Sequence, residues 1–293
     1  MTWFLLALCS ALLSAAAAIA QKKVLLRTHA LEFSFLLSVI IMLLSFSIPL
    51  TIDSMWVPPV TLWVILGKSL VGGMAFLLVM MSLERDQISR VLPLLGLTPA
   101  VTALVSLAVT GEHLQMWEWT GIVLVVAGAY LLEKRPAGAE GSAAGKIRLS
   151  RSHLYIVLAL LLFAASSVAD KTLVSGLKTD PRIVLVYQHV VYCFLFGGLL
   201  LVRRVPVEVL VKAGRAQAGY LIAIAVLTIA YRFTQLEATR DAPVALVLAV
   251  KRTSILYASF FGGRLFSEDR LKLRLAGAAL IVASGFVILR NVV

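Results

Sequence analysis

The chain has 293 residues, of which 60% are hydrophobic and only 14% charged, and its formal net charge is +12 at pH 7. Soluble domains carry about 45–50% apolar and about 25% charged residues, so this composition excludes a water-soluble globular fold, and its apolar content excludes a disordered chain. Nearly all Lys and Arg lie in short breaks between apolar runs, which is typical of charges that orient membrane spans. We therefore expect a multi-pass integral membrane protein in contact with lipid and without a nucleic-acid partner.

Uncharged runs follow one another along the chain, and we interpret them as ten transmembrane helices, because a charge at the bilayer centre costs at least about 2.5 kcal/mol. The shorter runs reach span length through boundary residues whose long side chains can snorkel. The first run also resembles a secretory signal, but its cations follow the apolar stretch, which favours a span. The runs are 1–21, 33–52, 54–67 with 69–83, 91–111, 119–132, 154–169, 183–202, 216–231, 242–250 with 253–263, and 275–289.

The one linker-like stretch is rich in Gly, Ala and Pro and lies near the middle of the chain, after five spans and before five more. We predict a first five-helix repeat at 1–133, a linker at 134–152 and a second repeat at 153–293. An offset of 149 places Ala169–Lys171 over Ala20–Lys22, and an offset of 156 places Glu268 and Gly277 over Glu112 and Gly121. These coincidences indicate an internal duplication.

An odd number of spans in each repeat makes the second copy enter the membrane from the opposite side. The predicted fold is therefore an all-α membrane protein of ten transmembrane helices in two inverted five-helix repeats. Inverted halves that meet at a midplane site can expose that site to either face in turn. A duplicated scaffold without transport is the alternative.

Motifs in both halves resemble the ten-helix drug/metabolite transporter superfamily, in its EamA branch. In the first half these are Leu83 to Pro93, Leu97-Thr-Pro99, Gly111-Glu112 and Trp119-Thr-Gly121; in the second they are Ala242 to Ser254, Ser267-Glu268 and Ala276-Gly277. The resemblance implies the ten-helix fold and transport, and says little about the substrate. Ile255 stands where the first copy has Pro99, so the sequence leaves open whether span nine bends as span four does.

Lys251 and Arg252 are the strongest candidates for a substrate site, because they lie about ten residues into span nine. Small residues such as Ala258 and Gly262 fall between their two directions on the helix. An adjacent pair of cations at that depth would be hard to keep without an anion. The pair also resembles the Lys-Arg dyad that contacts phosphate in plastid phosphate translocators.

Lys68 interrupts span three and is a third candidate, because its helical neighbours are mostly small or polar. The alternative for Lys68 is a structural ion pair. The obvious neutralising groups are Asp170, Glu84 and Glu237, and we expect all three to lie less deep than the three cations. A cavity shared by these cations would then favour a carboxylate or a phosphate.

Further candidates lie on other spans, and each has a structural alternative. For the residues near the ends of spans one, six and eight the alternative is snorkelling, and for the hydroxyl residues of spans four and nine it is close helix packing. These substrate-binding candidates are Lys22, Ser166, Ser167, Asp170, Lys171, Tyr231, Arg232, Gln235, Thr98 and Ser254.

The sequence offers no support for an enzyme. The four histidines, His29, His113, His153 and His189, lack metal-ligand spacing, and no GxxxxGK[ST] loop appears, so we expect neither a metal nor another cofactor and no drive from ATP hydrolysis. The predicted function is secondary active transport of a small anionic or zwitterionic metabolite, with a proton or an ion as a possible coupling partner. The alternatives are a broad exporter of hydrophobic compounds and a lipid-handling or assembly protein. A monomer or a homodimer fits equally well.

The connections on the linker side carry 18 Lys and Arg and those on the opposite side carry 5. The excess of cations marks the cytoplasmic side, which places the linker inside and both termini outside, most naturally in a bacterial inner membrane. The resemblance to EamA-type transporters implies the reverse orientation.

Overall fold

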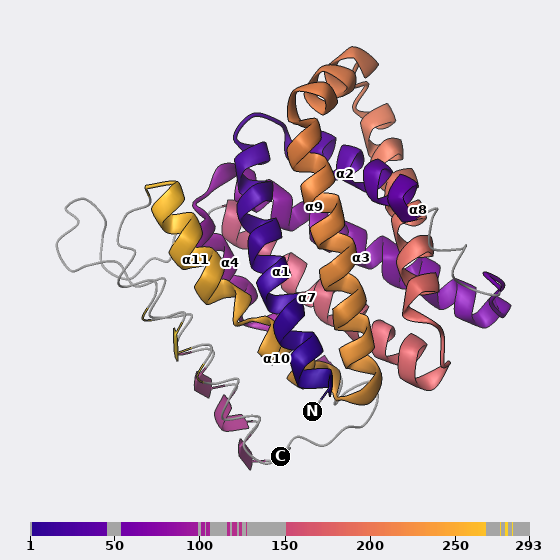
Figure 1. Ribbon diagram of the computed structural model, residues 1–293, viewed down its shortest axis with the longest axis vertical. Coiled ribbons are helices and arrows are strands. Elements are labelled where there is room, and N and C mark those ends of the chain that lie inside the picture. The colour runs from indigo at the N-terminus through magenta and orange to yellow at the C-terminus, as the bar shows by residue number, and fades with distance from the viewer. Residues whose placement is uncertain are drawn as a thin grey trace.

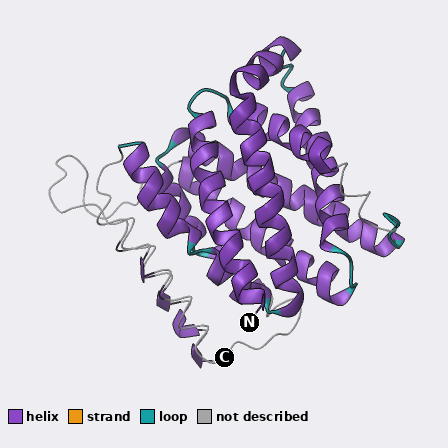
Figure 2. Ribbon diagram, viewed as in Figure 1, coloured by secondary structure: helices purple, strands orange, loops and turns teal. Residues whose placement is uncertain are grey.

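The computed structural model describes residues 2–45, 54–98 and 151–267, with scattered positions between 101 and 127 and between 276 and 283. Throughout these residues the regular structure is helical (Figure 2). Among the helices of the described ranges, five are long and apolar enough to cross a membrane. The helical membrane class is therefore confirmed. Only scattered positions of predicted spans five and ten are described, and the central linker at 134–150 lies outside the described residues.

The described helices correspond to predicted spans one to four and six to nine (Figure 1). Spans four and nine are each divided, and a short π-helix, η2, extends span six. The elements are α1 (Thr2–Leu25), α2 (Ala30–Ser45), α3 (Pro59–Arg85), α4 (Ile88–Leu95), α7 (Arg151–Lys171), η2 (Thr172–Gly176), α8 (Pro181–Val202), α9 (Val207–Asp241), α10 (Val244–Lys251) and α11 (Ser254–Leu265).

Prolines mark where several of these helices begin. Pro59 and Pro181 occupy the first helical positions of α3 and α8, where the missing backbone N–H has no intrahelical partner to lose. The Asp180 side chain caps α8 by accepting from the Arg182 backbone N–H at 2.8 Å. Hydrogen bonds from Arg182 also hold the pKa of this carboxyl group below its ordinary value.

Two antiparallel pairs of helices form the centre of the molecule. α1 packs along α9, and α7 packs along α3 (Figure 1). Ser10 donates to the Tyr231 carbonyl at 2.8 Å in the first pair, and Ser166 donates to the Lys68 carbonyl at 3.2 Å in the second. Each pair joins a helix from the first half of the chain to one from the second, so the core lies between the two halves.

The turn between α1 and α2 is tied to the end of α3. The Glu84 carboxylate accepts from the Ala30 backbone N–H at 3.0 Å and lies 2.8 Å from Nδ1 of His29. The hydrogen bond to Glu84 raises the pKa of His29 above its ordinary value. This pair keeps Glu84 at the end of its span, as predicted.

Gly72 lets α3 approach α7 and α8 closely. A Cβ atom at this position would lie 2.9 Å from both Ser166 Oγ and Tyr192 Oη. We expect Gly72→Val to destabilise the fold by about 1–3 kcal/mol through overpacking, measured by unfolding in mixed detergent micelles. The matched control is Gly67→Val, because a Cβ atom there meets nothing within 4 Å. Equal stability of the two variants would contradict this account of the helix contact.

Candidate functional site

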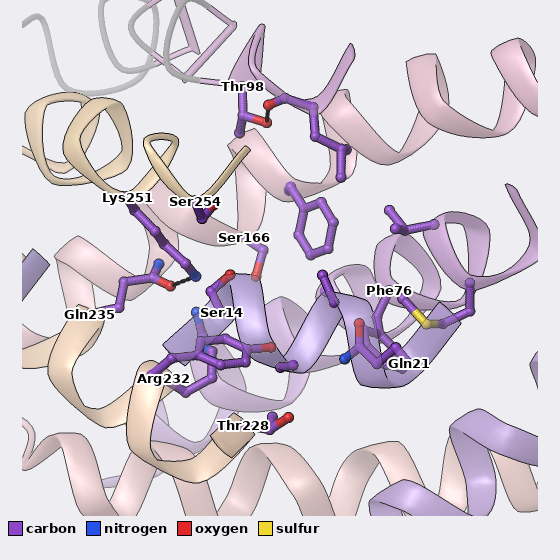
Figure 3. Close-up of a pocket in the computed structure, with 18 of the residues that line it drawn as sticks. Ser14, Gln21, Phe76, Thr98, Ser166, Thr228, Arg232, Gln235, Lys251 and Ser254 are labelled. Atoms are coloured by element: carbon purple, nitrogen blue, oxygen red, sulfur yellow. Dashed lines mark hydrogen bonds between the residues drawn. The ribbon is translucent and has the colours of Figure 1, made fainter. Parts of the chain in front are cut away.

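A cavity of about 160 Å³ lies at the centre of the helices, between the two halves of the chain (Figure 3). Ten of the thirteen predicted site residues line it. They come from α7, α9, α10 and α11 and from Thr98 beyond α4. The ten are Thr98, Ser166, Ser167, Asp170, Tyr231, Arg232, Gln235, Lys251, Arg252 and Ser254.

Spans four and nine are both interrupted where they meet this cavity. α10 ends at Lys251 and α11 begins at Ser254, and the Arg252 backbone N–H donates to the Leu248 carbonyl at 2.9 Å across the turn. α4 likewise ends at Leu95, and helical structure returns at Thr98. Span nine therefore breaks although no proline stands at the break, which resolves the point that the sequence left open.

Lys251 and Arg252 line the cavity with polar partners only. Lys251 Nζ donates to the Gln235 side-chain carbonyl and lies 4.6 Å from the centre of the Tyr231 ring (Figure 3). Arg252 Nη2 donates to Thr98 Oγ1 at 2.6 Å, and its buried Nε has no hydrogen-bond partner among the described residues. Within the described ranges no carboxylate lies within 4.0 Å of either cation. Of the small residues that the sequence placed between the two cations, Ala258 lines the cavity, whereas Gly262 packs against Ile88 and Ile19.

Lys68 lies behind the cavity wall and is neutralised. Its Nζ donates to Asp170 Oδ1 at 2.7 Å and to Gln188 Oε1 at 2.5 Å, and only 1% of its side chain is exposed. The structural ion pair that the sequence offered as the alternative is therefore what the fold contains. Lys68 is absent from the cavity lining, in contrast to the prediction that it faces the solute.

Asp170 lies much deeper than we predicted. Besides Lys68, it accepts from Arg232 Nη2 at 3.0 Å, and only 3% of its side chain is exposed. The expectation that all the carboxylates lie shallower than the cations was wrong for Asp170. The physical reason is the antiparallel packing of α7 on α3, which carries the last turn of α7 to the level of Lys68.

Lys22 and Lys171 do not line the cavity, because each binds the end of another helix. Lys22 Nζ donates to the carbonyls of Leu83 at 2.5 Å and Asp86 at 2.8 Å, where α3 ends. Lys171 Nζ donates to the carbonyls of Thr239 at 3.0 Å and Ala242 at 2.8 Å, where α9 ends. The contacts are equivalent in the two halves, since the acceptors are related by the offset of 156.

The sequence analysis missed the part of the cavity that α8 supplies. Gln188 accepts from both Lys68 and Arg232, and His189 and Tyr192 complete this wall. A signal was present, because Gln188 and His189 are polar residues within the apolar run 183–202. Span seven carries no charge in that run, however, and charged residues were the signal on which the predicted site depended.

Comparison with known proteins supports this architecture. A solved structure, described only as the crystal structure of a protein, aligns with a TM-score of 0.70 and 16% sequence identity over 97% of this chain and 95% of that chain. At this identity the likeness shows the fold alone. Residues 1–133 also match the model of a described family. That family is the EamA-like transporter family. The match confirms, for this part of the chain, the resemblance to EamA-type transporters. No curated protein matches the chain.

Proposed function

We propose that this protein is a secondary active transporter of a small anionic or zwitterionic metabolite, bearing a carboxylate or a phosphate. The observation that carries the proposal is the charge of the cavity lining. Among the described residues that line it, Arg232, Lys251 and Arg252 face a single carboxylate, Asp170. Asp170 already binds Lys68 as well as Arg232, so Lys251 and Arg252 are left to neutralise a solute.

Arg252 is the anchor of the proposed anion site. Its Nη2 is held by Thr98, while its Nε is buried with no partner among the described residues. A buried donor without an acceptor is costly, and a carboxylate or phosphate oxygen would remove that cost. The planar guanidinium group also suits two oxygens of one anion.

We further propose that the chain consists of two inverted repeats, at 1–133 and 153–293, that rock about this cavity. Support comes from the equivalent helix breaks in spans four and nine and from the equivalent lysines at the ends of α3 and α9. The helix contacts support the same symmetry. α1 and α7 are the first spans of the two halves, and α3 and α9 are the third spans. Because α1 packs on α9 and α7 packs on α3, the first span of each half contacts the third span of the other. Broken helices at a midplane site are typical of alternating-access transporters. We place the protein in a bacterial inner membrane, as a non-enzymatic monomer or homodimer.

A second candidate function is export of hydrophobic compounds. It is favoured by the cavity wall from the first half of the chain, which includes Phe76, Val79 and Met80. In that case the cations are structural, and uncharged apolar compounds bind as well as anions do.

The test is ligand-induced stabilisation of the purified protein by water-soluble anions, with acetate, butyrate, benzoate and phosphate as probes at constant ionic strength. An anion that binds only the folded state raises the unfolding temperature. Removing one partner of a buried charged contact costs about 2–5 kcal/mol, so we expect Lys251→Gln and Arg252→Gln to weaken binding at least about 30-fold. Proteoliposomes preloaded with the stabilising anion should then accumulate labelled anion only with the wild-type protein.

The matched controls are Lys212→Gln and Arg240→Gln, which remove the same charges from exposed positions. Both should keep wild-type binding. If no anion stabilises the protein, or if all four variants respond as the wild type does, the proposed anion site is wrong.

A further inference from the structure

The cavity has two chemically different walls, one from each half of the chain. Within the described residues, no charged side chain from the first half lines it, and we define its apolar wall as Ile41, Phe76, Val79, Met80 and Leu92. The second half supplies a basic wall, which we define as Arg232, Lys251 and Arg252. In Figure 3 Arg232, Lys251 and Gln235 lie on one side of the cavity, and Phe76 lies on the other.

The contrast is sharpest between positions that correspond at the offset of 156. Phe76 in α3 corresponds to Arg232 in α9, and both line the cavity. In the same way, Leu95 at the end of α4 corresponds to Lys251 at the end of α10. Positions related by this offset therefore carry opposite chemistry on the two sides of the cavity.

The first half contributes four polar residues to the lining, Ser14, Gln21, Ser38 and Thr98, and none of them carries a charge. Two of the four are engaged in hydrogen bonds. Ser38 Oγ donates to the Ser34 carbonyl at 2.7 Å. Thr98 Oγ1 donates to the Leu95 carbonyl at 2.6 Å and accepts from Arg252. A charged group of a solute placed against the apolar wall would lose its hydration without gaining a charged partner there, which is strongly unfavourable. An apolar group in the same place would gain free energy from burial.

We propose that the transported solute is an amphipathic organic monoanion, with its acid group at the basic wall and an apolar body against the apolar wall. This inference rests on the proposed anion transport and adds the second half of the substrate. The cavity volume of about 160 Å³ favours a short apolar body. We therefore expect a small acid with a short apolar chain or a ring to bind more tightly than a compact dianion does.

The test compares acids that differ only in the apolar part. Binding of acetate, propionate, butyrate and pentanoate is measured by isothermal titration of the wild-type protein in detergent. Each methylene group buried on the apolar wall should increase affinity about fourfold, until the cavity is full. Succinate has the same number of carbons as butyrate but a second carboxylate, and we expect it to bind at least about tenfold more weakly. Butyramide, which lacks the charge, should also bind more weakly than butyrate.

Variants identify the wall that is responsible. Phe76→Ala should reduce the gain per methylene group, so that pentanoate loses more affinity than acetate does. The Phe76 ring also stacks on Tyr192, so its loss can impair folding. Met80→Gln changes the same wall without removing that ring contact and serves as the second variant. Phe194→Ala is the control, because that ring is 77% exposed on the outer surface. The double variant Lys251→Gln/Arg252→Gln lacks the proposed anion site. Its titration therefore measures the partition of the acids into detergent, and this background is subtracted from the wild-type titration.

The outcomes separate this inference from the proposed function. Equal affinity for acetate and pentanoate, or binding of succinate as tight as that of butyrate, would overturn the amphipathic substrate and leave anion transport standing. Failure of every anion to bind would overturn the proposed function itself. Butyramide that binds as tightly as butyrate would favour the exporter of uncharged compounds and overturn both.

Discussion

Asp170→Asn is expected to destabilise the folded protein by about 3–5 kcal/mol, the largest effect on stability that we predict. The substitution leaves Lys68 and Arg232 buried without the carboxylate that both contact, at 2.7 Å and 3.0 Å. Removing one member of a buried ion pair is costly because the remaining charge is neither hydrated nor neutralised. Unfolding of the purified protein in mixed micelles of mild detergent and SDS measures the loss.

The control is Asp180→Asn, which makes the same change at the partly exposed cap of α8, where asparagine caps a helix about as well as aspartate does. Its stability should stay near that of the wild type. The double variant Asp170→Asn/Lys68→Met should lose less stability than the sum of the losses of the two single variants, because the two side chains interact directly. Additive losses, or an Asp170→Asn protein as stable as the Asp180→Asn control, would show that the buried cluster does not stabilise the fold as we describe.

Lys22→Met and Lys171→Met are expected to destabilise the protein by similar amounts, about 1–3 kcal/mol each. Either change removes an ammonium group that donates to two carbonyls at a helix end, and buried acceptors without a donor carry a cost of that size. Lys171 binds the end of α9, which packs on the first turns of α1, whereas Lys22 lies near the last turn of α1. The two sites are therefore far apart, and the double variant should lose the sum of the two single effects.

Lys23→Met is the control on the same helix. Lys23 is exposed and its Nζ lies 4.8 Å from the centre of the Tyr220 ring, so its loss should change stability far less. A large cost at only one of Lys22 and Lys171 would argue that their contacts are not equivalent, and would weaken the proposal of two inverted repeats.

The helices themselves were largely predictable from the sequence. Charges are expensive in a bilayer, so uncharged runs mark spans without knowledge of their neighbours, and prolines mark where α3 and α8 begin. Lys251 and Arg252 stood out for the same reason, and both line the cavity. What the sequence did not predict was the break at Arg252 and Thr253, because no proline or glycine stands there to interrupt the helix.

The partners of the deep charges were decided by tertiary structure. Lys68 and Asp170 are 102 residues apart, and nothing local in either segment indicates that an antiparallel contact between α3 and α7 joins them. The role of Gln188 depends on the same contact, because its side chain receives hydrogen bonds from two helices.

By itself the sequence determined a helical membrane protein and the two cations, Lys251 and Arg252, that no described carboxylate neutralises, because the cost of losing hydration acts on each charged residue separately. Only the packing of the helices decided which charges cancel and that one wall of the cavity is apolar. The energy of a charge inside a membrane protein depends on what lies within a few ångströms of it, and the fold sets that distance.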